Sequence, residues 1–119
     1  MYGLNKDVDL SFFIGKELTQ VAVGPYDVQF HFFESVWLSV QSRIEHNAGG
    51  IVSEWEGDEN KPRCAASLLG LLSSSVTSVQ GDPDGTLVLT FSNGDTVTVF
   101  DQEGYEAYQI GNGDQRIYV

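Results

Sequence analysis

Hydrophobic and polar residues alternate along much of the chain, a pattern typical of strands with one buried face. The alternation is clearest in four short runs: residues 27–34, 36–41, 86–91 and 96–99. A Glu-Ser pair separates the first two runs, and the sequence Ser-Asn-Gly-Asp separates the last two. Asn-Gly favours a tight hairpin because both residues tolerate positive φ. The pattern therefore predicts two β-hairpins, one in each half of the chain.

A similar segment precedes each hairpin. Residues 13–21 read Phe-Ile-Gly-Lys-Glu-Leu-Thr-Gln-Val, and residues 68–79 contain Leu-Leu-Gly followed by Val-Thr-Ser-Val. Each segment leads through a turn with Gly and Pro into its hairpin. We predict a weak internal repeat of residues 13–40 and 68–100, in which an entry strand and a hairpin are used twice. The alternative is chance similarity between two β-segments.

The stretch between the halves is the least regular part of the sequence. Residues 45–61 are rich in Gly, Asn and Glu, so we expect a loop there with a short strand at 51–54. Pro is favoured at the first position of a helix, and apolar residues follow Pro62 at helical spacing. We predict one short helix from Pro62 to Ser73. Two last strands are expected at 105–110 and 116–119.

Together these elements predict an α+β fold dominated by roughly eight antiparallel strands. Two meander-like halves bury their apolar faces against one another in a partly closed barrel or sandwich, and the helix packs on one face or end. Since no shift in composition marks a linker, residues 1–119 are expected to form a single domain.

The net charge of the chain limits the classes of partner that it can bind by electrostatic attraction. Seventeen Asp and Glu against six Lys and Arg give a formal net charge of -11. This charge argues against binding nucleic acid or an anionic membrane through electrostatic attraction, and it favours a basic protein partner.

The expected compartment is the cytoplasm. The first ten residues carry Lys6, Asp7 and Asp9 and lack the apolar core of a secretory signal. No apolar run reaches the roughly 18 residues that a membrane span needs. The single cysteine, Cys64, cannot form an internal disulfide, as is usual in a reducing compartment.

Motifs for catalysis or metal binding are missing. Without a Cys-His motif, Cys64 is expected to pack the helix as a small apolar residue. A zinc or general-base role for His31 or His46 needs partners that the sequence does not place, so structural or surface roles are expected. The segment 82–85 lacks the remaining ligands of a calcium loop and predicts a β-turn. We therefore expect no enzyme activity, no metal and no cofactor.

The second half of the chain resembles a family of uncharacterised small bacterial domains. The shared frame is Leu-Leu-Gly at 68–70, Asp-Gly at 84–85, Leu-Val-Leu-Thr-Phe at 87–91, Asn-Gly at 93–94 and Tyr-Glu-Ala-Tyr at 105–108. These elements are turns and core positions, so the resemblance concerns mainly the fold. Some relatives look like immunity proteins encoded beside polymorphic toxins. The resemblance implies a similar protein-binding function and no catalytic residue.

The most acidic segment is the best candidate for a binding surface. Trp is a frequent interface anchor, and carboxylates beside it would steer a basic partner toward the site. The expected contacts are Glu54, Trp55, Glu56, Asp58 and Glu59. The alternative is a solvated loop whose Trp folds back onto the core.

Two aromatic residues point to self-association. Phe33 and Trp37 are out of phase with Val28, Phe30 and Phe32, so on a regular strand they lie on the face that a monomer shows to water. We expect a homodimer to cover this face. The alternative is that residues 51–55 and 105–119 of the same chain fold across it.

A second function remains open beside protein binding. A small-ligand-binding β-barrel would have an interior lined by aromatic side chains, for which the candidates are Tyr26, Phe30, Trp37 and Tyr108. A binding module with a basic protein partner is the leading hypothesis.

Overall fold

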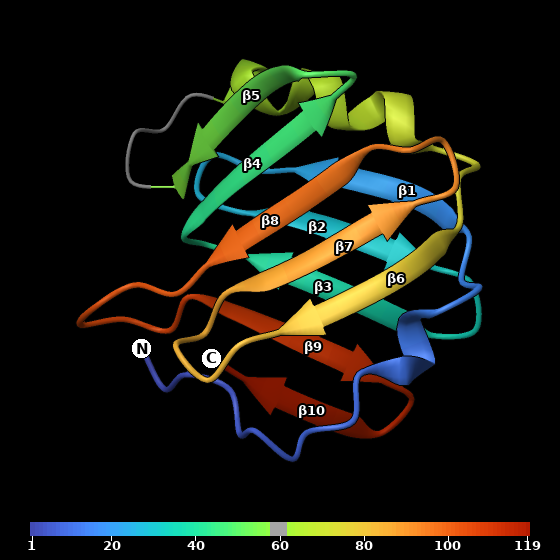
Figure 1. Cartoon of the computed structure of the whole chain (residues 1–119). Coiled ribbons are helices and arrows are strands. Elements are labelled where there is room, and N and C mark those ends of the chain that lie inside the picture. Colours follow the sequence, from blue (N-terminus) through green and yellow to red (C-terminus); the bar gives the residue numbers. More distant parts are fainter. Residues whose placement is uncertain (58–61) are drawn as a thin grey trace.

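The computed structural model describes residues 1–57 and 62–119. Figure 1 shows two layers of strands, with short helical segments at their margins. The elements in chain order are η1 (Ser11–Phe13), β1 (Leu18–Val23), β2 (Val28–Phe32), β3 (Val36–Val40), β4 (Arg43–Ala48), β5 (Ile51–Glu56), η3 (Pro62–Leu71), β6 (Val76–Gly81), β7 (Leu87–Phe91), β8 (Thr96–Phe100), β9 (Tyr108–Asn112) and β10 (Gln115–Tyr118). Both η elements are 3-10 helices.

The strands form two five-stranded antiparallel sheets. Sheet 1 has the order β1-β2-β3-β9-β10, and sheet 2 has the order β5-β4-β8-β7-β6. The prediction of a mainly antiparallel sandwich is confirmed, and the sheets are not closed into a barrel (Figure 1). The described part of the chain has ten strands rather than roughly eight, because residues 43–56 also form a hairpin.

The two sheets have the same construction. Each contains a three-strand meander, β1-β2-β3 or β6-β7-β8, and a hairpin that comes from the other half of the chain. The β9-β10 hairpin pairs with β3, and the β4-β5 hairpin pairs with β8. The first strand of each meander has a shift of register, between Leu18 and Gln20 in β1 and between Val76 and Ser78 in β6. The two meanders therefore match strand by strand.

Strand pairing shows which residues of the two sheets are equivalent. Leu38 pairs with Phe30 in sheet 1, and Val97 pairs with Leu89 in sheet 2. Taking Leu38 and Val97 as equivalent, their partners in the exchanged hairpins are Ile110 and His46. His46 thus occupies the position that a core isoleucine has in the other sheet.

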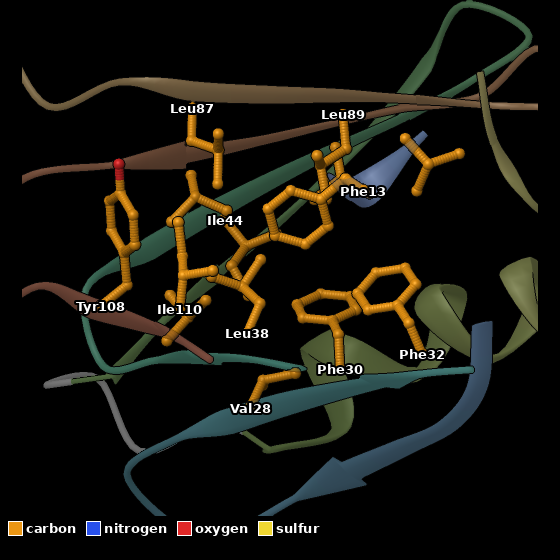
Figure 2. Close-up of a cluster of buried hydrophobic side chains, with 14 of the residues drawn as sticks. Phe13, Val28, Phe30, Phe32, Leu38, Ile44, Leu87, Leu89, Tyr108 and Ile110 are labelled. Atoms are coloured by element: carbon orange, nitrogen blue, oxygen red, sulfur yellow. The ribbon is translucent and has the colours of Figure 1, made fainter. Parts of the chain in front are cut away.

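The core lies between the sheets. Figure 2 shows apolar side chains of both layers pointing toward one another. The Phe32 and Phe91 rings, one from each sheet, lie 6.4 Å apart between centroids, and Phe13 meets Phe32 edge to face at 5.6 Å. Side chains thus fill the interior that a small-ligand-binding barrel would leave open. Phe30 and Tyr108 are buried here, whereas Tyr26 is 65% exposed and Trp37 belongs to the other face of its sheet. The predicted aromatic lining of one interior is therefore wrong.

The short strand predicted at 51–54 is confirmed within β5, whereas the loop predicted around it is wrong for residues 45–48, and residues 58–61 lie outside the described part of the chain. Residues 43–48 and 51–56 form β4 and β5, joined at Gly49 and Gly50. Ile44 and His46 face the core, and a histidine at a core position hides the apolar alternation that marks a strand. The predicted helix is confirmed as η3, which lies against β5 and β1 at one margin of the sandwich.

Tyr108 links the two layers. Its buried hydroxyl donates a hydrogen bond to the Gly85 carbonyl at 2.7 Å, and desolvation raises the pKa of the phenol above its ordinary value.

The Tyr108 hydroxyl of an unfolded chain loses its proton near pH 10, whereas that of the folded chain keeps it. Stability should therefore fall as the pH rises above about 10. Chemical denaturation at increasing pH measures this loss, which should be smaller in Tyr108→Phe; an equal loss in both proteins would contradict it.

Candidate functional site

The acidic segment lies on a strand rather than in a loop. Trp55 faces the core and is 2% exposed, so its indole is not an interface anchor, and the alternative of an indole folded onto the core is the one that occurs. Glu54 and Glu56 lie on the opposite, outer face of β5, where Glu54 is exposed and Glu56 half-buried. Asp58 and Glu59 lie outside the described residues.

Within the described residues, β5 is a sheet edge without the bulge, the shortness or the basic side chains found at the other edges, although η3 lies against this strand. Edge strands are commonly protected by bulges, by shortness or by basic side chains. β1 and β6 each contain a shift of register, and β10 has four residues including Arg116. β5 has six residues in unbroken register with β4, and its sequence Ile-Val-Ser-Glu-Trp-Glu contains no Lys, Arg or Pro. The first two side chains are 73% and 53% exposed. By length, regularity and lack of basic side chains, this edge is the most suitable of the four to accept another strand where η3 leaves it free.

The backbone of β5 turns alternate residues toward the free edge. The Gly57 amide donates to the Ser42 carbonyl at 2.8 Å, so this pair is of the hydrogen-bonded type. Hydrogen-bonded and non-hydrogen-bonded pairs alternate along an antiparallel ladder. Val52, Glu54 and Glu56 consequently point their N–H and C=O groups away from β4. They offer the donors and acceptors that an added strand needs.

The surface beside this edge has an excess of negative charge. Glu45 on β4 pairs across the strands with Glu54, and Arg43 pairs with Glu56. The Arg43 guanidinium lies 3.0 Å from the Glu45 carboxylate and 3.5 Å from that of Glu54, and it stacks on the Phe100 ring at 3.8 Å. One arginine thus stands among three carboxylates.

A hollow opens where β5 ends. Its volume is about 390 Å³, and its lining residues are Tyr26, Gln41, Gly57, Gln102 and Tyr105. The two tyrosines are 65% and 76% exposed. Tyrosine is enriched at interfaces because it offers a large apolar ring with a polar end. The hollow adjoins the end of β5, since Gly57 directly follows Glu56.

The two residues predicted to mediate self-association lie on sheet 1. Phe33, just beyond β2, is 61% exposed. Trp37 on β3 is half-buried on the outer face of the sheet, the face that its phase predicted. A second hollow borders Trp37. Whether a second copy covers this face stays a prediction.

A third cluster joins three separate segments. Within it, His46 on β4 is 3% exposed. Its Nδ1 lies 2.9 Å from the Ser67 hydroxyl on η3, and its Nε2 lies 2.8 Å from the Asp95 carboxylate before β8. These three residue types form nucleophilic triads in hydrolases. Here the histidine nitrogens have exchanged roles relative to such triads, and the hydrogen bonds connect η3 to β4 and to the β7-β8 turn. We assign a structural role to the cluster.

Sequence reasoning missed this cluster. The sequence pattern predicts a loop at His46, and neither Ser67 nor Asp95 belongs to a recognised motif. Only the pairing of β4 with β8 places residue 46 near residue 95. The sequence offers one indication of the cluster, which is the polar residue His46 at a core-facing position of β4. This indication can be used only after β4 has been recognised as a strand.

The remaining candidates from the sequence are Cys64 and the segment 82–85. Cys64 is exposed rather than packed under the helix. Asp82 and Gly85 form a turn in which the Gly85 amide donates to the Asp82 carbonyl at 2.9 Å, as predicted. Among the described residues, no group of three or more His, Cys, Asp or Glu is arranged to hold a metal ion. No helix in that part of the chain has the length and apolar character needed to cross a bilayer.

Comparison with known proteins places the chain among uncharacterised domains. Residues 10–119 match the model of a family of unknown function (DUF6188). No curated protein and no solved structure matches the chain. The matched range includes every strand that the structure describes, so it extends over both sheets.

Proposed function

The chain belongs to this family of unknown function, and we propose that it is a protein-binding module that takes up a basic, extended segment of a partner along the free edge of β5. The observation that supports the proposal is the long, unbroken edge of β5 together with its carboxylates. Strand addition to such an edge gains affinity from backbone hydrogen bonds and specificity from alternate side chains.

The carboxylates beside the β5 edge favour a partner strand with basic side chains. Glu45, Glu54 and Glu56 face the side chains that an added strand would place on the outer face of the sheet. Lysine or arginine at alternate positions of that strand would meet these carboxylates. The net charge of -11 would in addition raise the association rate of a basic partner.

The hollow at the end of β5 adjoins this edge. A cationic side chain at the end of the bound segment would lie between the rings of Tyr26 and Tyr105, where cation-π attraction favours it. Val52, at the other end of the edge, offers an apolar contact.

The partner that fits this chemistry is a basic protein. The resemblance to immunity proteins extends the proposal to an antagonist of a basic toxin, acting in the cytoplasm. The mode of action would be occupation of the toxin's basic surface, so the module needs no catalytic residue and no cofactor.

A second copy of the chain is a poor occupant of this edge. Antiparallel pairing of β5 with its copy, centred on Glu54, would bring the two Glu54 carboxylates opposite one another, and like charges opposite one another are destabilising. A homodimer through Phe33 and Trp37 would use sheet 1 instead, so it is compatible with the proposed binding.

Binding of a model peptide tests the proposal. We expect a short capped peptide of alternating lysine and valine to bind the protein, as measured by fluorescence polarisation, and an alternating glutamate and valine peptide not to bind. Reversing the charges in Glu54→Lys with Glu56→Lys should weaken binding at least about tenfold, equivalent to about 1.4 kcal/mol. Raising the salt concentration should also weaken it.

Val52→Pro separates strand addition from simple charge attraction. This variant keeps every charge and removes one backbone donor that points away from β4, so the fold is retained. It should lose peptide binding. Equal binding by Val52→Pro and the wild type would show that the peptide associates by charge alone and would overturn the proposal, as would the absence of binding to the wild type.

A further inference from the structure

The outer face of sheet 1 presents two rows of side chains in register. One row crosses the strands through His31, Trp37, Gly111 and Arg116. The neighbouring row is made of Gln29, Ser39, Gln109 and Tyr118. Each row takes one residue from β2, β3, β9 and β10, so four strands position these groups.

A hollow of about 280 Å³ lies between the rows. It is lined by Gln29, His31, Trp37, Ser39 and Gln109. Ser39 is the small residue in the middle of its row, between two long glutamines, and this contrast in size creates the depression. No carboxylate, ammonium or guanidinium group belongs to the lining. Pockets for small molecules have volumes from about 300 Å³ upward, and the volume of this hollow is close to that lower limit.

Hydrogen bonds hold one wall of the hollow in a defined orientation. The Gln29 amide nitrogen donates to the Asp27 carboxylate at 3.0 Å, which turns the Gln29 carbonyl oxygen toward His31 Nε2 at 3.1 Å. His31 therefore donates from Nε2, and Nδ1 of the neutral ring is left as an acceptor. Of the residues that line the hollow, Gln29 and His31 make side-chain hydrogen bonds within the described part of the chain, and Ser39 and Gln109 do not. Both offer donors and acceptors to a ligand.

Trp37 forms the apolar wall. The indole lies over Gly111, where a Cβ would overlap the ring, so glycine at this position is what lets the ring lie along the sheet. The Arg116 guanidinium lies 5.2 Å from the ring centroid. Glycine and arginine together hold the indole beside the polar floor.

The equivalent face of sheet 2 has no carboxamide, imidazole or indole at these positions. By the equivalence of the two meanders, Gln29, His31, Trp37 and Ser39 correspond to Val88, Thr90, Thr96 and Thr98. Gln109 corresponds to Glu45. Threonine and valine are ordinary residues for the exposed face of a strand. The fold therefore does not require the glutamines, the histidine and the tryptophan of sheet 1.

We propose that this hollow binds a neutral saccharide of one or two rings. Sugar hydroxyls both donate and accept hydrogen bonds, as do the carboxamides of Gln29 and Gln109 and the hydroxyl of Ser39. The part of the Trp37 indole that borders the hollow, beside the portion near Arg116, offers an apolar contact to the C–H groups of a sugar ring. An uncharged lining in a chain of net charge -11 favours a ligand that is also uncharged.

Indole fluorescence provides a direct test with defined probes. The chain has two tryptophans, and Trp55 is 2% exposed, so a change caused by a ligand reports Trp37. We expect a saturable change during titration with at least one of maltose, cellobiose, chitobiose and xylobiose. Digalacturonic acid, which is anionic, should give none. The absence of a saturable change with every neutral disaccharide would overturn the proposal.

A matched pair of variants locates the site. Ser39→Thr copies the residue of sheet 2 and adds a methyl group at the centre of the hollow, so it should weaken binding at least about tenfold. Thr98→Ser, the reverse change at the equivalent position of sheet 2, should leave binding unchanged. Equal binding by Ser39→Thr and the wild type would overturn the location. Sedimentation that showed a dimer split by Trp37→Glu would assign the face to a second copy and overturn the proposal as well.

Discussion

Replacing Phe91 with alanine is expected to lower the free energy of unfolding by about 3–5 kcal/mol. Phe91 is 1% exposed, and its ring lies nearly parallel to that of Phe32 from the opposite sheet, with centroids 6.4 Å apart. The substitution removes a contact between the layers and leaves a cavity where both meanders meet. A single domain has about 5–15 kcal/mol in total, so much of its stability would be lost.

Denaturant unfolding followed by circular dichroism measures this effect. Phe33→Ala is the matched control, because Phe33 is 61% exposed and lies one residue beyond β2. Its effect should stay within about 0.5 kcal/mol, as is usual for surface positions. Similar losses in the two variants would show that Phe91 is not part of a shared core.

The second large effect concerns the buried histidine. His46→Ala should destabilise the protein by about 2–4 kcal/mol, because it removes two hydrogen bonds, opens a cavity and leaves the Asp95 carboxylate without its partner. Asp95 is 16% exposed, so water compensates part of this loss. Denaturant titration near neutral pH measures the difference.

The other sheet supplies the control for this prediction. Its residues at the positions of His46 and Asp95 are Ile110 and Val36, a buried apolar pair. The double variant His46→Ile with Asp95→Val should therefore lie within about 1 kcal/mol of the wild type, since a well-packed apolar pair replaces a buried polar pair at little cost. A double variant less stable than His46→Ala would show that the apolar solution of sheet 1 does not transfer to sheet 2.

Both meanders could be predicted from the sequence because their apolar residues follow a period of two. Val28, Phe30 and Phe32 face the core, as do Leu87 and Leu89. The phase that placed these residues inside also placed Trp37 outside. Local alternation thus predicts both the strand and the direction of its side chains.

The pairing between the halves could not be read in the same way. The exchange of hairpins depends on β3 meeting β9 and β8 meeting β4, and no local pattern encodes which hairpin completes which sheet. Local alternation does not predict β4, because His46 interrupts its apolar face. It also does not predict the direction of Trp55, because Glu54 and Glu56 on either side are typical of a solvated loop.

The binding surfaces depend on neighbours that lie far apart in sequence. The hollow on sheet 1 needs Ser39 between Gln29 and Gln109, and the last of these comes from the other end of the chain. The β5 edge became a candidate only through comparison with the edges β1, β6 and β10. Such comparisons require the strand order.

The exchange of hairpins also determines how the chain can fold. β3 is a central strand, yet one of its neighbours is β9. Sheet 1 is complete only when Val36 has paired with Asn112 and Val40 with Tyr108. Contacts between such distant residues are formed late, because a long loop must close first, and chains rich in them fold slowly. Neither half contains all the strands of a sheet. Removing the C-terminal strands β9 and β10 would expose β3 in the middle of sheet 1. The fold therefore becomes stable only when these last strands have paired.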